Sequence, residues 1–314
     1  MAGKADVTLL VNPHAGRGRA EAIAHQVAAL LGARGLRATV STAESVLAMR
    51  AIAAEAVQQG DAGLVVIGGD GMCHLAIQEI AGTSTALGIV PAGTGNDFAT
   101  ALALPHDVPA ATAGIADALE AGEHRRVDLA RCGQRWWASV LCAGFDSAVN
   151  DRANRMRWPH GPRRYDLALL MELARLRAVP MTLDLDGATV TLDATLVAVG
   201  NTSTYGGGIP ICPRADPSDG LLDVTVVTRI NRRRLIRVTP TLRRGEHLAH
   251  PAVRRYRART ISVRCAEPPV VTAYADGEPI SALPVTAICH SGALRILQPN
   301  GVQPRESPNA RFRW

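Results

Sequence analysis

The sequence predicts an α/β domain followed by an all-β domain. In the first part of the chain, short apolar runs alternate with helical patterns, which is typical of a parallel, doubly wound sheet. From about Arg131 the apolar runs alternate with a period of two and are separated by turn residues, which is typical of antiparallel strands. A chain of 314 residues is long enough to form both domains.

The first domain is expected to alternate strictly between strands and helices. We expect strands at residues 7–12, 38–43, 63–70 and 86–93, and helices at 20–35, 46–59, 74–82 and from about Asn96. Ligands of such sheets bind beyond the carboxyl ends of the strands.

The second domain is expected to be mostly antiparallel. Its strands are predicted within residues 135–145, 181–201, 222–228, 259–266 and 270–280, with one helix at 165–176. The apolar segment 293–299 fits a strand of either domain, and no internal repeat is visible.

Composition narrows the class of partner. The net charge is +6, and the basic residues concentrate in 152–164 and 229–264, which favours anionic partners. Aromatic residues make up only 4% and do not interleave with the arginines, which argues against nucleic acid. An anionic lipid surface is the preferred partner, and Trp158 ahead of the apolar helix fits it. The alternative for that segment is a solvated basic face over an ordinary core helix.

Two kinds of segment are not found in the sequence. No apolar run approaches the roughly 18 to 20 residues that span a bilayer, and the N-terminus does not resemble a signal peptide, so we expect an intracellular protein. The six cysteines are widely scattered, which argues against a disulfide framework and structural zinc.

Four Gly-rich stretches each follow an apolar run, at residues 9–21, 64–80, 88–99 and 196–224. Glycine lets backbone N–H groups converge on an anion and lets a phosphate approach without meeting a Cβ atom. One such loop is weak evidence. Several, each at the end of an apolar run, predict a phosphate-binding site, although no Walker A pattern is present.

Acidic side chains accompany these loops. Asp70 lies between glycines, and Thr94, Asn96 and Asp97 follow the next apolar run, where an alcohol and a second carboxylate fit phosphoryl transfer with Mg²⁺. The structural alternative for Asp70 is an N-cap in a tight turn.

Further acidic residues could also have a purely structural role. Asp128 stands in RRVDLA, and the pair Asp276 and Glu278 stands in a DGE sequence that usually forms a hairpin corner. Asp216, Asp219 and Asp223 surround a turn that is either tied by a cation or a plain polar loop.

Taken together, these motifs resemble the diacylglycerol kinase catalytic family, in its bacterial soluble branch of lipid kinases. The resemblance is carried, in order along the chain, by NPHAG, GGDG, PAGTGNDFA, CAGFD, GGGIPICPRADPSDGLLDV and DGE, and it covers Leu9 to Pro299. It implies an NAD-kinase-like doubly wound α/β nucleotide domain followed by a β-sandwich lipid-binding domain. The expected boundaries are 1–131, with 291–299 returning to this domain, then 132–290, and a flexible tail at 300–314.

The resemblance also implies roles for individual residues. ATP would be contacted by Asn12, Pro13, His14, Ala15, Gly16, Arg17, Thr42, Gly68, Gly69, Asp70, Gly71, Thr94 and Asn96. Catalytic Mg²⁺ would be organised through water by Asp70, Asp97 and Asp128. The general base would be Asp276 or Glu278, and a structural Mg²⁺ would be held by the Asp219 side chain with backbone oxygens of Asp216 and Leu221.

Three positions depart from the family pattern. Met72 replaces a usual Thr, Ala15 a usual Ser, and Thr100 a common phosphate-facing Arg. Loss of one hydroxyl donor to a phosphate costs about 1 to 2 kcal/mol. Arg17 or Arg19 could supply the missing charge, and because the acids are all retained we expect an active enzyme.

The resemblance implies that the chain transfers the γ-phosphoryl group of ATP to diacylglycerol, giving phosphatidic acid at the inner face of the membrane. Alternative acceptors are a sphingoid base, ceramide and a monoacylglycerol. A catalytically silent, nucleotide-dependent membrane sensor is the alternative from another class. The expected partners are a lipid substrate at a membrane surface and anionic phospholipid, without nucleic acid, and a homodimer is kept open.

Overall fold

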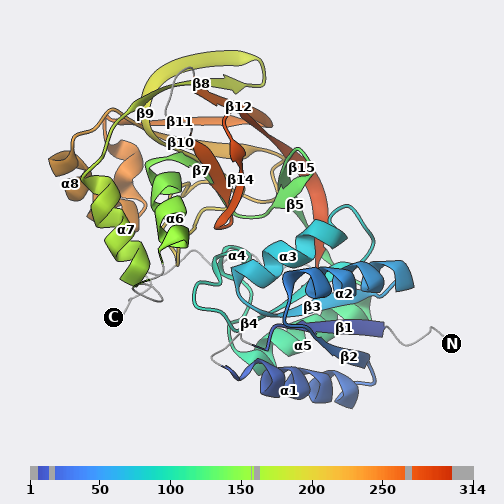
Figure 1. The fold of residues 1–314 in the computed structure, drawn as a ribbon. Helices are drawn as coiled ribbons and strands as arrows, with labels where there is room; N and C mark the ends of the chain where they lie inside the picture. The colour runs from blue at the N-terminus through green and yellow to red at the C-terminus, as the bar shows by residue number, and fades with distance from the viewer. Residues whose placement is uncertain (1–5, 14–17, 157, 159–162, 266–270, 299–314) are drawn as a thin grey trace. The chain divides into compact units, whose positions relative to one another are not determined.

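The structure is a computed structural model that divides the chain into two compact units. It describes residues 6–13, 18–156, 158, 163–265 and 271–298. The first unit contains the described residues up to Val127 and from Ala293 onward, and the second contains Asp128–Gly292 (Figure 1). Each unit has its own buried core.

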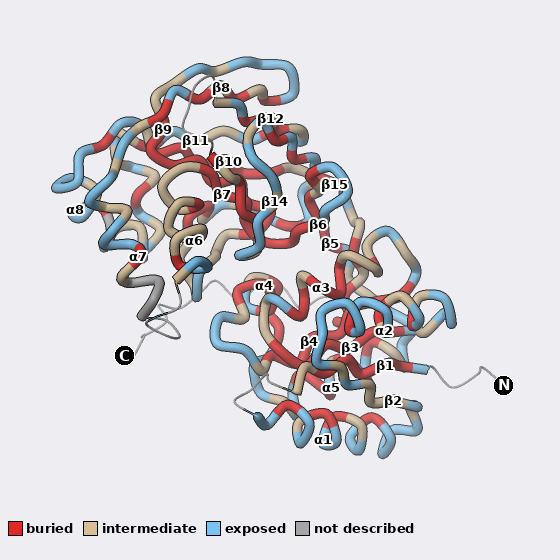
Figure 2. The backbone as a smooth tube through the Cα atoms, in the orientation of Figure 1, coloured by how far each residue is buried: buried red, intermediate tan, exposed pale blue. Residues whose placement is uncertain are grey.

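The first unit is built on a parallel sheet with the strand order β4-β3-β1-β2. Its strands are β1 (Asp6–Val11), β2 (Arg37–Thr42), β3 (Gly63–Gly68) and β4 (Ala86–Pro91). All residues of β3 and β4 are buried, as expected of central strands covered on both faces (Figure 2).

Helices connect these strands, and the sequence predicted all of them but the last. They are α1 (Ala20–Ala33), α2 (Val46–Gln59), α3 (Asp70–Ile80), α4 (Asp97–Ala101) and α5 (Val108–Ala121). The side chain of Ser45 caps the start of α2, and Gly60 ends that helix in the left-handed conformation.

Several boundaries in this unit were predicted wrongly; the strand expected at 86–93, for example, ends at Pro91. The strand expected from residue 63 was to continue to Asp70, but β3 ends at Gly68 and Asp70 is already the first residue of α3. Gly69 is extended and serves as the N-cap, and a carboxylate in the first turn is favoured by the positive end of the helix dipole.

The register of the sheet brings the Gly-rich loops to one edge. Thr42 pairs with Val11, Val11 with Ile67, and Ile67 with Val90. These four residues therefore form one row across the carboxyl ends of the strands. The chain leaves this row into the first three Gly-rich stretches.

The second unit is antiparallel throughout its described strand pairs. Its strands are β5 (Arg125–Cys132, which starts in the first unit), β6 (Arg135–Trp137), β7 (Val140–Gly144), β8 (Val179–Leu185), β9 (Ala188–Gly200), β10 (Leu222–Thr228), β11 (Val253–Ala258), β12 (Thr260–Cys265), β13 (Thr272–Ala275), β14 (Glu278–Ala282) and β15 (Val285–Ile296).

Strand β9 joins two parts of this sheet system. Residues 188–194 of β9 pair with β8, and residues 196–200 lie between β7 and β10. The core of the unit contains buried side chains from these strands and the fully buried Trp137 of β6. The predicted combination of a doubly wound α/β domain and a β-sandwich-like domain is confirmed.

Helices on the second unit are more numerous than the sequence pattern indicated. The predicted helix at 165–176 is α7 (Arg163–Leu173), but α6 (Phe145–Arg155), α8 (Arg232–Arg243) and the 3-10 turn η2 (Glu246–Ala249) were not expected. The run 135–145, read as strand, is divided into β6, β7 and the start of α6. The left-handed Gly144, with φ at +100°, changes the chain direction there.

The end of β15 belongs to the first unit. The amide of Gly82 donates to the carbonyl of Ala293 at 2.8 Å, and the amide of Leu297 donates to the carbonyl of Leu87 at 2.8 Å. Leu297 is buried in the same core cluster as Val65 and Ile115. The apolar segment that sequence alone left open therefore packs on the first unit.

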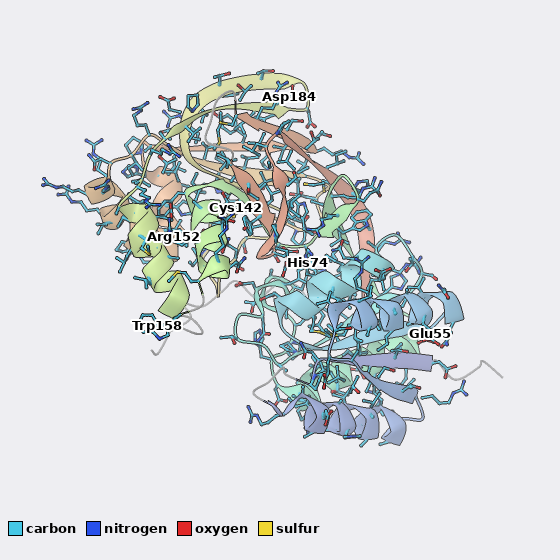
Figure 3. The ribbon with its side chains drawn as sticks, viewed as in Figure 1. Glu55, His74, Cys142, Arg152, Trp158 and Asp184 are labelled. Atoms are coloured by element: carbon cyan, nitrogen blue, oxygen red, sulfur yellow. The ribbon has the colours of Figure 1, made fainter. Side chains whose placement is uncertain are left out.

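The cysteines are all free thiols, as the scattered spacing predicted. Most are buried, among them Cys142, which Figure 3 labels beside α6. Burial raises the pKa of Cys132 to about 11. Among the described helices, none combines the length and apolar character needed to cross a membrane.

Two glycines in the first unit give opposite stability predictions. A Cβ atom on Gly88 of β4 would lie 2.8 Å from Cγ2 of Val65 and 3.2 Å from Cδ1 of Ile115, both in the core. Gly88→Ala is therefore expected to lower the free energy of unfolding by about 1 to 3 kcal/mol through overpacking.

The matched control is Gly114 of α5, where an added Cβ meets nothing within 4 Å. Gly114→Ala is expected to raise the free energy of unfolding by up to about 1 kcal/mol, because alanine favours the helix. Urea unfolding of both variants measures the difference, and equal effects would contradict the packing around Gly88.

Candidate functional site

Two Gly-rich loops of the first unit touch each other at the edge of the sheet. A Cβ atom on Gly69 would lie 3.0 Å from the Cα atom of Gly93, and one on Gly93 would lie 2.9 Å from the amide nitrogen of Gly69. Only glycine permits this approach of two backbones. The amide of Ala92 also donates to the carbonyl of Gly68 at 2.9 Å, which ties the loops together.

Side chains of Asn96 and Asp70 fix the shape of these loops. The Asn96 side chain accepts from the Gly93 amide at 3.0 Å and donates to the Gly93 carbonyl at 3.1 Å, while its backbone is left-handed with φ at +56°. Oδ1 of Asp70 accepts from the amide of Phe98 at 3.0 Å. Asp70 thus caps α4 from the first turn of α3, whereas the N-cap of α3 itself is Gly69.

Backbone donors remain open at this edge. In the part of the chain that the structure describes, the amides of Asp70, Gly71, Thr94 and Gly95 make no hydrogen bond to the protein. Gly71, Gly93 and Thr94 are exposed. Open N–H groups at the start of α3 and in the adjoining turn are donors of the kind that an anion such as a phosphate requires.

Other predicted nucleotide contacts start from the same row of the sheet. Thr42 is the last residue of β2 and is exposed, and Asn12 and Pro13 directly follow β1. The predicted residues His14, Ala15, Gly16 and Arg17 lie outside the described residues.

Two of the three departures from the family pattern now have a structural context. Met72 is 6% exposed, and a Cβ on Gly68 would lie 2.6 Å from its Cγ atom, so the thioether packs onto the end of β3. The Thr100 hydroxyl donates to the carbonyl of Asn96 at 2.8 Å and lies 3.1 Å from Nε2 of His106. An imidazole therefore stands beside the position where an arginine is common, and no sequence motif had indicated His106.

In the second unit, Asp276 and Glu278 lie on a tight hairpin between β13 and β14. Both central residues of the turn, Asp276 and Gly277, have positive φ angles, of 51° and 84°, which defines a type I′ turn. The Asp276 carboxylate accepts from the amides of Ala138 and Ser139, each at 2.8 Å. Glu278 is exposed, and its side chain makes no hydrogen bond or ion pair with any described residue.

Asp128 is buried, and both of its carboxylate oxygens are in use. Oδ1 accepts from the amide of Gly292 at 2.7 Å, and Oδ2 accepts from the amide of Gly220 at 2.6 Å. Its backbone carbonyl accepts from Asn201 at 2.9 Å. These contacts hold two loops of the second unit together, and the expected role of Asp128 toward Mg²⁺ stays a prediction.

The loop that was expected to hold a structural Mg²⁺ is held here by an arginine. Oδ1 of Asp219 accepts from the amide of Leu221 at 3.0 Å, and its Oδ2 pairs with the guanidinium of Arg257. Asp216 accepts from Ser218 in a local turn. A cation bound through Asp219 would compete with Arg257, so this set as described does not fit Mg²⁺ well. Among the described residues, no cluster of three or more acidic, His or Cys side chains is arranged to hold a metal.

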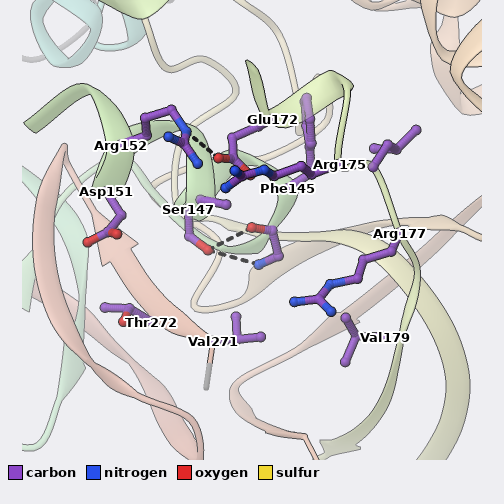
Figure 4. A pocket seen from close by; sticks show the side chains of 13 residues that line it. Phe145, Ser147, Asp151, Arg152, Glu172, Arg175, Arg177, Val179, Val271 and Thr272 are labelled. Carbon is purple, nitrogen blue, oxygen red and sulfur yellow. Dashed lines mark hydrogen bonds and ion pairs between the residues drawn. The ribbon is translucent and has the colours of Figure 1, made fainter. Parts of the chain in front are cut away.

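A pocket of about 440 Å³ lies within the second unit, between α6, α7 and the start of β13. Its walls combine apolar side chains, including Phe145, Leu176 and Val179, with Arg152, which pairs with Glu172 (Figure 4). Arg175 and Arg177 also line it. Sequence reasoning missed this pocket because its residues are distant in the chain and belong to no phosphate motif.

Beside this pocket, Asp146 at the start of α6 receives a short hydrogen bond from the Tyr205 hydroxyl. Burial raises the pKa of Asp146 to about 6, and the Tyr205 hydrogen bond opposes that rise. Burial likewise raises the pKa of Tyr205, with the Asp146 charge as a further cause. The CAGFD motif thus supplies a carboxyl group that changes charge near neutral pH.

Comparison with known proteins decides the family. Residues 6–132 match the model of the diacylglycerol kinase catalytic domain, and residues 139–298 match that of the YegS C-terminal NAD kinase beta sandwich-like domain. A protein of Mycobacterium tuberculosis named diacylglycerol kinase is 43% identical over 93% of this chain and 95% of its own length. The chain belongs to the diacylglycerol kinase family.

Other members of the diacylglycerol kinase family are more distant. A diacylglycerol kinase of Staphylococcus saprophyticus is 27% identical over 95% of this chain and 97% of its own, and a Stenotrophomonas maltophilia protein named probable lipid kinase YegS-like is 30% identical over 79% and 82%. A crystal structure of a Bacillus anthracis diacylglycerol kinase superposes with a TM-score of 0.72 at 19% identity, covering 96% of this chain and 100% of that chain. That likeness shows the fold alone.

The raised pKa of Asp146 predicts a pH-dependent stability. Since its pKa is about 6 in the folded chain and 3.8 ordinarily, the folded state binds the proton more tightly, and stability falls as the pH rises from about 4 to about 6. Asp146→Asn keeps an oxygen acceptor for Tyr205 but carries no charge. Its free energy of unfolding is expected to exceed that of the wild type by about 3 kcal/mol at pH 8, and the difference should vanish toward pH 4.

Tyr205→Phe is the companion variant. It removes the hydrogen bond that favours the ionised carboxyl group, so the pH-dependent step should move to higher pH. Urea unfolding across the pH range measures all three proteins. A pH slope in Asp146→Asn as steep as in the wild type would rule out Asp146 as its source.

Proposed function

We propose that the chain is an ATP-dependent lipid kinase that transfers the γ-phosphoryl group to the hydroxyl of diacylglycerol, giving phosphatidic acid. The observation that carries the proposal is the contact of the two glycine loops, which leaves four open amides beside Asp70 and Asp97. The names of the relatives support a lipid kinase of this kind.

On the nucleotide side, the protein supplies donors and carboxylates. The open amides of Gly71 and Thr94 and the hydroxyl of Thr94 are suited to phosphate oxygens. Oδ1 of Asp70 is used by the Phe98 amide, which orients the carboxylate and leaves Oδ2 for a hydrated cation. Asp97 is 6% exposed and is the first residue of α4.

ATP and Mg²⁺ fit this edge because its donors are backbone amides and its acids are hard oxygen ligands. Bound there, Mg²⁺ would neutralise charge on the phosphate oxygens. Asp70 and Asp97 would hold it through water, and Asp128 is the third acid proposed for this role.

On the acceptor side, Glu278 is the better candidate for the general base. A base must take the proton from the lipid hydroxyl while the hydroxyl oxygen bonds to the γ-phosphorus and the bond to the ADP oxygen breaks. Protonation of Asp276 would disturb its two hydrogen bonds to the amides of Ala138 and Ser139. Glu278 carries no such bonds, and Asp276 holds the turn that positions it.

The acceptor could also be another lipid alcohol, such as a sphingoid base, ceramide or a monoacylglycerol. The pocket of the second unit combines apolar walls with arginines, a lining that suits an amphiphile without selecting one headgroup. Met72 favours the alternative of a catalytically silent sensor. Its side chain packs against the end of β3 and offers no hydrogen-bond donor to a phosphate.

Substitution of the two hairpin acids separates catalysis from structure. Glu278→Gln is expected to lower kcat about 100-fold or more, with the free energy of unfolding unchanged, because the side chain contacts nothing that the fold needs. Asp276→Asn is expected to lose about 1 to 3 kcal/mol of stability as well as activity, because one anchored amide loses its acceptor.

The assay uses labelled ATP, Mg²⁺ and mixed micelles that carry diacylglycerol, with urea unfolding in parallel. Glu246→Gln is the control, since Glu246 is exposed and, among the described residues, its side chain pairs with Arg244 alone. No phosphatidic acid from the wild type would defeat the kinase proposal. Normal turnover by Glu278→Gln would defeat the base assignment alone.

Gly71 offers a test of the phosphate site. An added Cβ at Gly71 meets nothing within 4 Å, so Gly71→Ala is expected to leave the free energy of unfolding unchanged or slightly raised. ATP binding should weaken about tenfold, because the added Cβ would keep a phosphate from reaching these amides at hydrogen-bond distance, although the amides themselves are retained. Titration calorimetry with ATP measures the affinity, and an unaltered dissociation constant would remove Gly71 from the site.

A further inference from the structure

The fourth Gly-rich stretch, residues 196–224, lies in the second unit, unlike the other three. It starts within β9, and Asn201 directly follows that strand. Asn201 is fully buried, with 0% of its surface exposed. A buried amide side chain has two N–H donors and one acceptor oxygen, and most such groups in folded proteins find partners. The partners of Asn201 therefore show which parts of the unit it connects.

The Asn201 side chain joins two backbone carbonyls that are far apart in the chain. Its Nδ2 donates to the carbonyl of Asp128 at 2.9 Å and to the carbonyl of Ala138 at 2.8 Å. The Oδ1 atom is buried and accepts no hydrogen bond from the described residues. Because an unsatisfied buried acceptor lowers stability, a contribution to stability alone does not account for an amide at this position.

The segment of Ala138 and Ser139, between β6 and β7, is held from two sides. On one side, the Ala138 carbonyl accepts from the Asn201 side chain, and the Ser139 carbonyl accepts from the amides of Asn201 at 2.9 Å and Thr202 at 3.1 Å. On the other side, the amides of Ala138 and Ser139 donate to the Asp276 carboxylate, each at 2.8 Å. The segment thus connects Asn201 to the hairpin between β13 and β14.

The hairpin is at the edge of its sheet and depends on this connection. Among the described strands, β14 pairs with β13 alone. Glu278 is the first residue of β14, and the Asp276 amide donates to the carbonyl of Val140 at 3.2 Å. An edge strand has fewer contacts to restrain it than a central strand. The anchor of Asp276 on the 138–139 segment therefore carries much of the restraint on the position of Glu278.

We propose that Asn201 is a positioning residue, which holds Glu278 in place for phosphoryl transfer. It acts through the 138–139 segment and Asp276, and the inference rests on the proposed function, in which Glu278 is the general base. A base must lie within hydrogen-bond reach of the hydroxyl that it deprotonates, and a displacement of about 1 Å costs up to about 100-fold in rate. The alternative is a purely structural role, in which loss of Asn201 only lowers the amount of folded protein.

Asn201→Ala removes both side-chain donors and tests the role in turnover. At a temperature where circular dichroism shows the variant to be folded, kcat is expected to fall about 30-fold to 100-fold. The KM for ATP should stay unchanged, because the glycine loops of the first unit keep their contacts. Asn201→Ser, which keeps one hydroxyl donor, should lose less turnover and replaces Asn201→Ala in every measurement if alanine prevents folding.

The matched control is Thr195→Ala. Thr195 lies on the same strand as the residue before Asn201, is 2% exposed, and donates its hydroxyl to the carbonyl of Thr228 at 3.0 Å. This variant also loses a buried hydrogen bond but leaves the 138–139 segment untouched, so it should lose stability and keep the kcat of the wild type. An equal fall of kcat in Thr195→Ala and Asn201→Ala would overturn the proposal.

A double-mutant cycle with Glu278→Gln separates positioning from loss of fold. If Asn201 acts through Glu278, adding Asn201→Ala to Glu278→Gln should lower kcat less than about threefold further, because the base is already absent. A smaller amount of folded protein would lower turnover by the same factor in both backgrounds. The same factor in both would therefore overturn the positioning role.

Amide hydrogen exchange of the full chain tests the connection without turnover. The amides of Ala138 and Ser139 are expected to exchange faster in Asn201→Ala than in Thr195→Ala, and equal exchange would overturn the connection. A wild type without kinase activity would defeat the proposed function, and the role of Asn201 in turnover with it. An active wild type with an equally active Asn201→Ala variant would overturn the role of Asn201 alone.

Discussion

The contact between Gly69 and Gly93 is the constraint on which the rest of the candidate site depends. A side chain at either position would separate the loops that follow β3 and β4. With the backbones in contact, Asp70 can reach the amide of Phe98 and start α4, and Asn96 can close the second loop around Gly93. The amides that remain open are open because these side chains hold the loops in a shape that the backbone alone would not keep.

The second unit uses carboxylates in a related way. Asp128 joins the loops at Gly220 and Gly292, and Asp276 joins its hairpin to Ala138 and Ser139, in each case through two backbone amides. Buried or half-buried amides need an acceptor, and a carboxylate supplies two at once. An acid that stabilises a loop in this way is poorly suited to accept a proton, which is why the exposed Glu278 differs in kind from its neighbour Asp276.

The same division applies to the arginines. Some form ion pairs that stabilise the fold, such as Arg257 with Asp219 and Asp223, and Arg152 with Glu172. Others, on α8, project from a helix whose opposite side is buried. Net charge alone does not distinguish the two groups, because the distinction depends on which carboxylates the fold places within reach.

The sequence by itself determined the alternation of strands and helices in the first unit, the antiparallel character of the second, and the Gly-rich loops with their acids. Those features follow from the local periodicity of apolar residues and from the spacing of glycines, both of which depend on residues that are close together in the chain. Only the tertiary structure decided that Asp70 begins a helix and caps another, that Met72 turns into the packing at Gly68, and that Asp128 and Asp276 bind amides far away in the chain. It also decided that residues 232–243 form a helix with one buried side, since that arginine-rich segment is stabilised by packing of three apolar side chains and not by its own composition. Contacts between residues that are distant in the chain follow from the fold of the whole unit, so the local sequence pattern does not predict them.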